Sequence, residues 1–118
     1  MKWWTTLGLD LVWLLVVAVI GRLSHGEAAD PVGILETAWP FVVALVGVTV
    51  AVIGFKWAPE NVGPGALIWV GTVLFGMWIR VSHGATAQVA FIIVASIVIG
   101  LGLIGWRVFH RVRRNTHG

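Results

Sequence analysis

The chain has 118 residues, of which 58% are hydrophobic and 11% are charged, and its formal net charge at neutral pH is +3. Ordinary soluble domains contain about 25% charged residues, so this composition leaves too little polar surface to cover a globule in water. The absence of cysteine excludes disulfides, thiol redox chemistry and thiolate metal sites. We therefore predict a single membrane domain over residues 1–118.

Four stretches have the length and composition of membrane-spanning helices, which need about 20 mainly apolar residues. The predicted spans are residues 3–23, 37–56, 65–82 and 86–107, followed by a basic tail at 107–118. The third span is short, but slight thinning of the bilayer and the long side chain of Arg80 can absorb the deficit. The predicted fold class is an all-α membrane protein with four transmembrane helices.

The charge distribution predicts the orientation of these spans. An even number of spans places both termini and the central loop on one face of the membrane. That face carries six cations, Lys2, Lys56, Arg107, Arg111, Arg113 and Arg114. The opposite face carries two, Arg22 and Arg80. Because positively charged loops stay in the cytoplasm, we expect a multi-pass protein of the plasma membrane with cytoplasmic N- and C-termini.

The tryptophans and the tail agree with this orientation. The predicted spans place Trp3, Trp4, Trp57, Trp69 and Trp106 near the inner interface, and Trp39 and Trp78 near the outer one. Such aromatic belts are typical of both membrane interfaces. The cations of the tail meet anionic lipids of the inner leaflet, each with a gain of about 1 kcal/mol. The expected partner of the tail is therefore lipid and not nucleic acid.

An internal repeat suggests how the helices are arranged. The motif Arg-x-Ser-His-Gly occurs at 22–26 and again at 80–84, at the outer ends of the first and third spans. The second and fourth spans align as well, with Thr37-Ala38 matching Thr86-Ala87. This pattern predicts two parallel helical-hairpin repeats, related by a pseudo-twofold axis along the membrane normal.

Small residues occupy matching positions in the second and fourth spans. Gly47 and Ala51 align with Ser96 and Gly100. Small residues let membrane helices approach closely, so we expect the second and fourth helices to meet near the axis. The alternative is that glycine is simply common in membrane helices.

Five motifs in order resemble those of the small integral-membrane family known as domain of unknown function 3054. The motifs are Gly-Arg-Leu-Ser-His-Gly-Glu at 21–27, Glu-Thr-Ala-Trp-Pro-Phe at 36–41, Gly-Met-x-x-Arg at 76–80, Gly-x-Thr-Ala at 84–87 and Gly-Trp-Arg at 105–107. The resemblance covers the chain from the first span to Arg107. It implies a polytopic prokaryotic membrane protein, and it brings no established activity and no catalytic residues to carry over.

Asp10 is the only charged residue deep within the first predicted span. A carboxylate at full membrane depth costs about 2 to 3 kcal/mol, so something must offset this cost. One interpretation is a proton or cation site. The other is a structural pair with Lys56 or Arg107 near the inner surface, or solvation by lipid head groups.

Two cationic pairs are predicted at the outer ends of the first and third spans. Arg22 with His25, and Arg80 with His83, are each spaced three residues apart and so share a helical face. If the repeats bring them together, these side chains and Glu36 could bind an anion or relay protons. The alternative is helix capping, with Gly26 and Gly84 as left-handed caps. Capping explains the histidines better than it explains two arginines at membrane depth.

Enzymatic activity has the least support. The sequence contains no nucleophile with a base and an orienting acid, no phosphate-cradling glycine loop and no His-Glu-x-x-His pattern. Haem or metal ligation by His25 and His83 is disfavoured, because both lie at helix ends outside a ligand cluster. We expect no catalytic residues, no metal and no cofactor.

Two classes of function remain. In the first, Arg22, Arg80, His25, His83, Glu36 and Asp10 help a small anion, proton or solute to bind in the bundle or cross it, which in so small a bundle calls for a homodimer. In the second, the chain is a non-enzymatic accessory or structural subunit of a larger membrane complex. The symmetric recurrence of charged residues favours the first class.

Overall fold

The computed structural model describes residues 2–24, 31–84 and 89–117 and consists of four α-helices with short connections. They are α1 (Trp3–Ser24), α2 (Pro31–Gly54), α3 (Val62–Ser82) and α4 (Val89–His117). Each contains a stretch long and apolar enough to cross a membrane. The predicted all-α membrane fold with four spanning helices is confirmed.

Prolines at the starts of helices and a glycine after the end of one help to set where the helices begin and end. Pro31 is the first residue of α2, and Pro64 lies in the first turn of α3, where a missing N–H breaks no helical hydrogen bond. α3 ends at Ser82 and is followed by Gly84, whose φ of +86° is the left-handed conformation that favours glycine. This cap was predicted, whereas its counterpart Gly26 lies outside the described residues.

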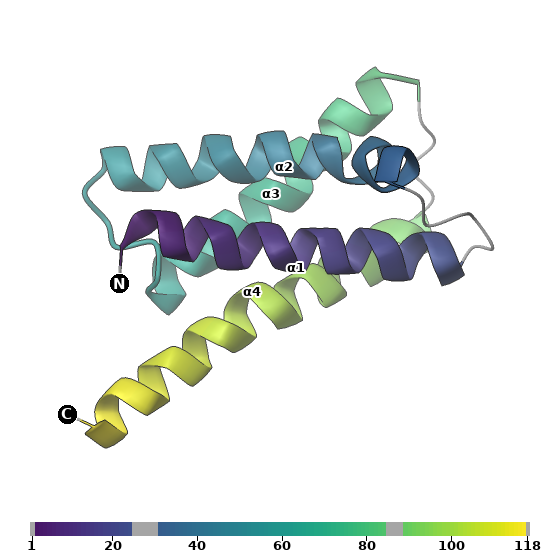
Figure 1. The fold of residues 1–118 in the computed structure, drawn as a ribbon. Coiled ribbons are helices and arrows are strands. Elements are labelled where there is room, and N and C mark those ends of the chain that lie inside the picture. The colour runs from purple at the N-terminus through teal and green to yellow at the C-terminus, as the bar shows by residue number, and fades with distance from the viewer. Residues whose placement is uncertain (1, 25–30, 85–88, 118) are drawn as a thin grey trace.

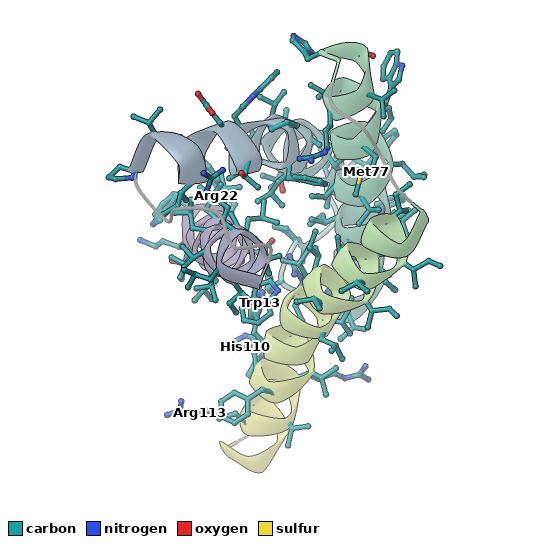
Figure 2. All side chains as sticks on the ribbon, turned by 90° about the vertical axis from the view of Figure 1, so that its right-hand side faces the viewer. Trp13, Arg22, Met77, His110 and Arg113 are labelled. Carbon is teal, nitrogen blue, oxygen red and sulfur yellow. The ribbon has the colours of Figure 1, made fainter. Side chains whose placement is uncertain are left out.

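The start of α2 differs from the expectation. The helix begins at Pro31 and not near residue 37, and it continues through Pro40 in its interior. A proline inside a helix removes one backbone hydrogen bond and clashes with the preceding turn, which kinks the helix. Figures 1 and 2 show the first turns of α2 running at a steep angle to the rest of the helix.

The helices form a ring in chain order. α1 packs against α2 and α4, α3 packs against the same two helices, and the diagonal pairs α1 with α3 and α2 with α4 do not pack together. The expectation that the second and fourth helices meet is therefore wrong. Gly47, Ala51 and Gly54 of α2 are exposed, because the other face of α2 fills the core.

Apolar side chains fill the centre of the ring. Fully buried members come from three helices, with Leu45 on α2, Ile68 on α3 and Leu103 on α4. Large apolar side chains such as Leu74 and Leu101 point outward and are more than 60% exposed. Apolar side chains on the outside as well as in the core suit a bundle whose outer surface faces lipid.

Both termini and the α2–α3 connection lie at one end of the bundle (Figure 1). We call this the inner end, following the orientation that the charge distribution predicts, and we call the opposite end the outer end. Figure 2 views the bundle from the outer end.

Candidate functional site: a buried ion pair between the first and last helices

Asp10 of α1 and Arg107 of α4 form a two-pronged ion pair near the inner end. The Arg107 Nη2 atom lies 2.7 Å from Asp10 Oδ2, and its Nη1 atom lies 3.0 Å from Oδ1. Both side chains are 0% exposed. Asp10 lies about 10 Å along the helix axis from the start of α1. The structure thus pairs Asp10 with one of the two partners considered above, while the other, Lys56, is exposed.

Further hydrogen bonds complete this pair. The indole Nε1 of Trp106 donates to Asp10 Oδ1 at 2.8 Å. Arg107 Nε donates to the carbonyl oxygen of Pro59 at 2.9 Å, and Arg107 Nη1 donates to that of Leu103 at 2.8 Å. A buried ion pair offsets the cost of leaving water only when its remaining polar atoms are satisfied. These contacts tie together α1, α4 and the α2–α3 connection.

Gly65 makes room for the guanidinium in the first turn of α3. A Cβ atom at this position would lie 2.5 Å from Arg107 Nε, so any larger residue would displace the arginine. The Gly65 N–H donates to the carbonyl oxygen of Asn61 at 2.8 Å, which starts the helix beside the arginine. The site therefore depends on a glycine that carries no chemistry of its own.

Two tryptophans attach their helices to the backbone of α4. Trp13 Nε1 on α1 donates to the Val98 carbonyl at 3.1 Å, and Trp69 Nε1 on α3 donates to the Ser96 carbonyl at 2.8 Å. Figure 2 shows Trp13 between α1 and α4. Both indoles lie against glycines of α4, Trp13 against Gly102 and Trp69 against Gly100, where a Cβ would overlap the rings.

Three threonine hydroxyls add polarity to the core. Thr6, Thr49 and Thr72, from α1, α2 and α3, are each at most 1% exposed. Their Oγ1 atoms have no hydrogen-bond partner within the described part of the chain. Because an unpaired buried hydroxyl is costly, these positions are where the interior could accommodate water or a small polar solute.

At the outer end, Arg22 and Arg80 are half-buried. Arg22 Nη1 donates to Thr37 Oγ1 at 3.2 Å, and Thr37 Oγ1 donates to the Gly33 carbonyl at 3.0 Å. Figure 2 shows Arg22 between α1 and α2. Glu36 is exposed in the second turn of α2 and not at its start.

His83 lies at the exposed C-terminus of α3. Its Nδ1 is 3.0 Å from the Ile79 carbonyl oxygen, and its ring meets that of Trp39 edge to face at 4.9 Å. These contacts fit the capping interpretation. His25 lies outside the described residues, and α1 and α3 do not pack together. The convergence of the two Arg/His pairs therefore remains a prediction.

Among the described residues, no three His, Cys, Asp or Glu side chains are grouped so that they could hold a metal ion.

Sequence reasoning missed the indole donors. Trp69 and Trp106 were assigned to an interfacial belt, but they donate hydrogen bonds to Ser96 and Asp10. The Trp69 hydrogen bond could have been inferred from the glycines of α4, which lie at the depth of this tryptophan.

Comparisons with known proteins place the chain in one family. No curated protein and no solved structure is significantly similar to it. One family profile matches residues 7–110, a range that includes both Asp10 and Arg107. The chain therefore belongs to the family described as Protein of unknown function (DUF3054).

Proposed function

We propose that this protein binds or translocates a small anion, proton or polar solute in the interior of its bundle, as a non-enzymatic protein of the plasma membrane with cytoplasmic termini. The observation that carries the proposal is the fully buried Asp10–Arg107 pair. Ionisable residues inside membrane helices are expensive, and they commonly mark ion or substrate pathways.

The geometry supplies a way to open the pair. A proton that reaches Asp10 removes the carboxylate charge and leaves Arg107 without its counter-ion. An anion that reaches Arg107 competes with Asp10 for the same N–H donors. Either event weakens the link between α1 and α4, so the ligand has a differential affinity for closed and open states, as any ligand-driven switch requires.

The rest of the proposed path consists of weaker polar positions. The hydroxyls of Thr6, Thr49 and Thr72 are polar sites in the core. We assign the outer mouth to Arg22, His25, Glu36, Arg80 and His83, as the sequence predicts. The support for this assignment is the half-buried position of the two arginines.

The proposal is tested in proteoliposomes, with protons followed by a pH-sensitive dye and chloride by an electrode. We expect an inward proton gradient to drive uptake of these probes faster than in empty liposomes. Asp10→Asn holds residue 10 in a neutral form that resembles the protonated carboxyl, so it should abolish the dependence of chloride uptake on the proton gradient. Arg22→Gln combined with Arg80→Gln should slow the same uptake.

The matched control is Arg113→Gln, which removes an exposed charge on α4. It should retain both the uptake and its dependence on the gradient. Uptake equal to that of empty liposomes, or chloride uptake that still responds to the proton gradient in Asp10→Asn, would contradict the proposal.

A second candidate is an accessory subunit, and the exposed small residues of α2 favour it. Gly47, Ala51 and Gly54 lie on the exposed face of α2, away from the core, and a Cβ at either glycine would meet nothing within 4 Å. Such stripes let another membrane helix approach closely. Gly47→Leu should then separate the chain from a partner, or from a second copy, that copurifies in mild detergent. Recovery of the unmodified chain alone would count against this candidate.

A further inference from the structure

A pocket of about 510 Å³ opens at the inner end, between the start of α3 and the C-terminal part of α4. It is lined by residues 60–64 and by His110, Arg111 and Arg114. This volume is within the range of small-molecule sites, about 300 to 1,000 Å³. The pocket lies outside the Asp10–Arg107 pair, and its role does not depend on the function proposed above.

One wall of the pocket is the N-terminus of a long helix. The N-cap residue Asn61 makes no side-chain hydrogen bond to the helix start. The N–H groups in the first turn of a helix have no acceptor inside the helix, which leaves those of Val62 and Gly63 for a ligand. The positive end of the helix dipole reinforces their attraction for an anion.

The facing wall is cationic. Arg111 and Arg114 line the pocket from α4, and within the described part of the chain neither has an ion-pair partner. Both side chains are exposed, so they can reach a ligand without breaking an existing contact. One acid, Glu60, also lines the pocket, so the two arginines leave an excess of positive charge.

A buried, unpartnered donor or acceptor gives independent evidence for a ligand. His110 lines the same pocket, and its Nε2 atom is buried with no hydrogen-bond partner among the described residues. The centroid of the Trp106 ring lies 6.4 Å from that of the imidazole. When protonated at Nε2, an imidazole donates a hydrogen bond to an oxygen anion.

The buried ion pair holds this pocket in shape. Arg107 Nε donates to the carbonyl of Pro59, directly before the lining segment, and Gly65 directly after that segment lies against the same side chain. Both ends of the segment 60–64 thus lie against Arg107, which is one turn before His110 on α4. The backbone donors at the start of α3 are positioned before any ligand arrives, which lowers the cost of binding.

We propose that this pocket binds a phosphate group. Guanidinium groups, a helix N-terminus and an imidazole are the donors that bind the oxygens of a phosphate ester or ion. The group comes either from an anionic phospholipid of the inner leaflet, whose head groups lie at the level of a helix end, or from free phosphate in the cytoplasm.

The test uses the full chain in phosphatidylcholine nanodiscs, with two probes. Inorganic phosphate is titrated by calorimetry at constant ionic strength. Phosphatidylglycerol is added as a minor lipid, and its retention over phosphatidylcholine is measured by native mass spectrometry. Arg111→Gln and Arg114→Gln should each weaken binding roughly fivefold. The matched control Arg113→Gln removes the same charge outside the pocket lining and should change binding less than about twofold.

A spectroscopic readout separates a built pocket from general attraction to charged lipid. The side-chain ¹⁵N resonances of His110, assigned by their loss in His110→Gln, should shift when the probe binds. Binding of both probes, or of either alone, supports the pocket and identifies the source of the phosphate. Equal weakening by Arg113→Gln and Arg114→Gln, or a His110 resonance that neither probe shifts, overturns it.

Discussion

The contacts between α2 and α3 and between α1 and α4 hold the bundle together in different ways. α2 and α3 make the most extensive helix contact, through close apolar packing in which Val48 and Phe41 lie against Gly71 and Gly76. α1 and α4 make the least extensive one, and α4 diverges from the bundle toward its C-terminus (Figure 1). This second contact contains the Asp10–Arg107 pair and the Trp13 hydrogen bond.

We call the α2–α3 contact the apolar joint and the α1–α4 contact the charged joint, because the two depend on different physical properties. The packing of membrane helices through glycines depends on the shapes of the two helix surfaces, and a proton or an anion does not change those shapes. A joint made by one ion pair and a few hydrogen bonds depends on charge, which a proton or an anion can change. The contrast explains why the candidate site lies between α1 and α4.

The largest expected effect comes from breaking the charged joint on one side. Arg107→Ala leaves Asp10 buried without a counter-ion and should lower the free energy of unfolding by about 3 to 5 kcal/mol. Unfolding in mixed micelles with increasing sodium dodecyl sulfate measures this loss. Arg113→Ala is the control, because Arg113 is exposed on the same helix. A loss below about 1 kcal/mol would place the pair in a solvated, surface-like setting.

A smaller effect is expected from overpacking the apolar joint. In Gly76→Ala the new Cβ would lie 2.5 Å from Cδ1 of Phe41, and such a clash should cost about 1 to 3 kcal/mol. Gly47→Ala places its methyl group in open space on α2 and should leave stability unchanged or slightly higher. If both variants unfold alike, close packing of α2 on α3 is not what fixes that joint.

The smallest effect is expected from removing one indole donor. Trp13→Phe deletes the hydrogen bond to the Val98 carbonyl and keeps most of the ring, so it should cost about 0.6 to 1.7 kcal/mol. Trp78→Phe is the comparison, since this side chain is 68% exposed. Equal stability of the two variants would show that the indole N–H adds nothing to the contact between α1 and α4.

Much of the fold follows from the order of polar and apolar residues. The mainly apolar stretches predicted four helices, because a bilayer accepts little else. The start of α2 was placed too late, because the predicted span began only after the charged residue Glu36. The pairing of α2 with α4 was wrong because aligned small residues reveal equal depth but not which face meets the core.

The candidate site was only partly predictable. Asp10 stood out because a carboxylate within a span needs compensation, and Arg107 was one of two cations at a suitable depth. Geometry alone chose between that arginine and Lys56, through the clearance at Gly65 and the carbonyl of Pro59. The pocket beside His110 could not be predicted, since it joins two segments that are far apart in the sequence.

The most direct test of the charged joint is a double-mutant cycle. Asp10→Ala, Arg107→Ala and the double variant are unfolded in the same mixed micelles, and the coupling free energy is obtained from the four stabilities. We predict a coupling of about 1 to 3 kcal/mol, with the double variant more stable than the sum of the single losses implies. A coupling below about 0.3 kcal/mol would contradict the account, because the two residues would then act independently.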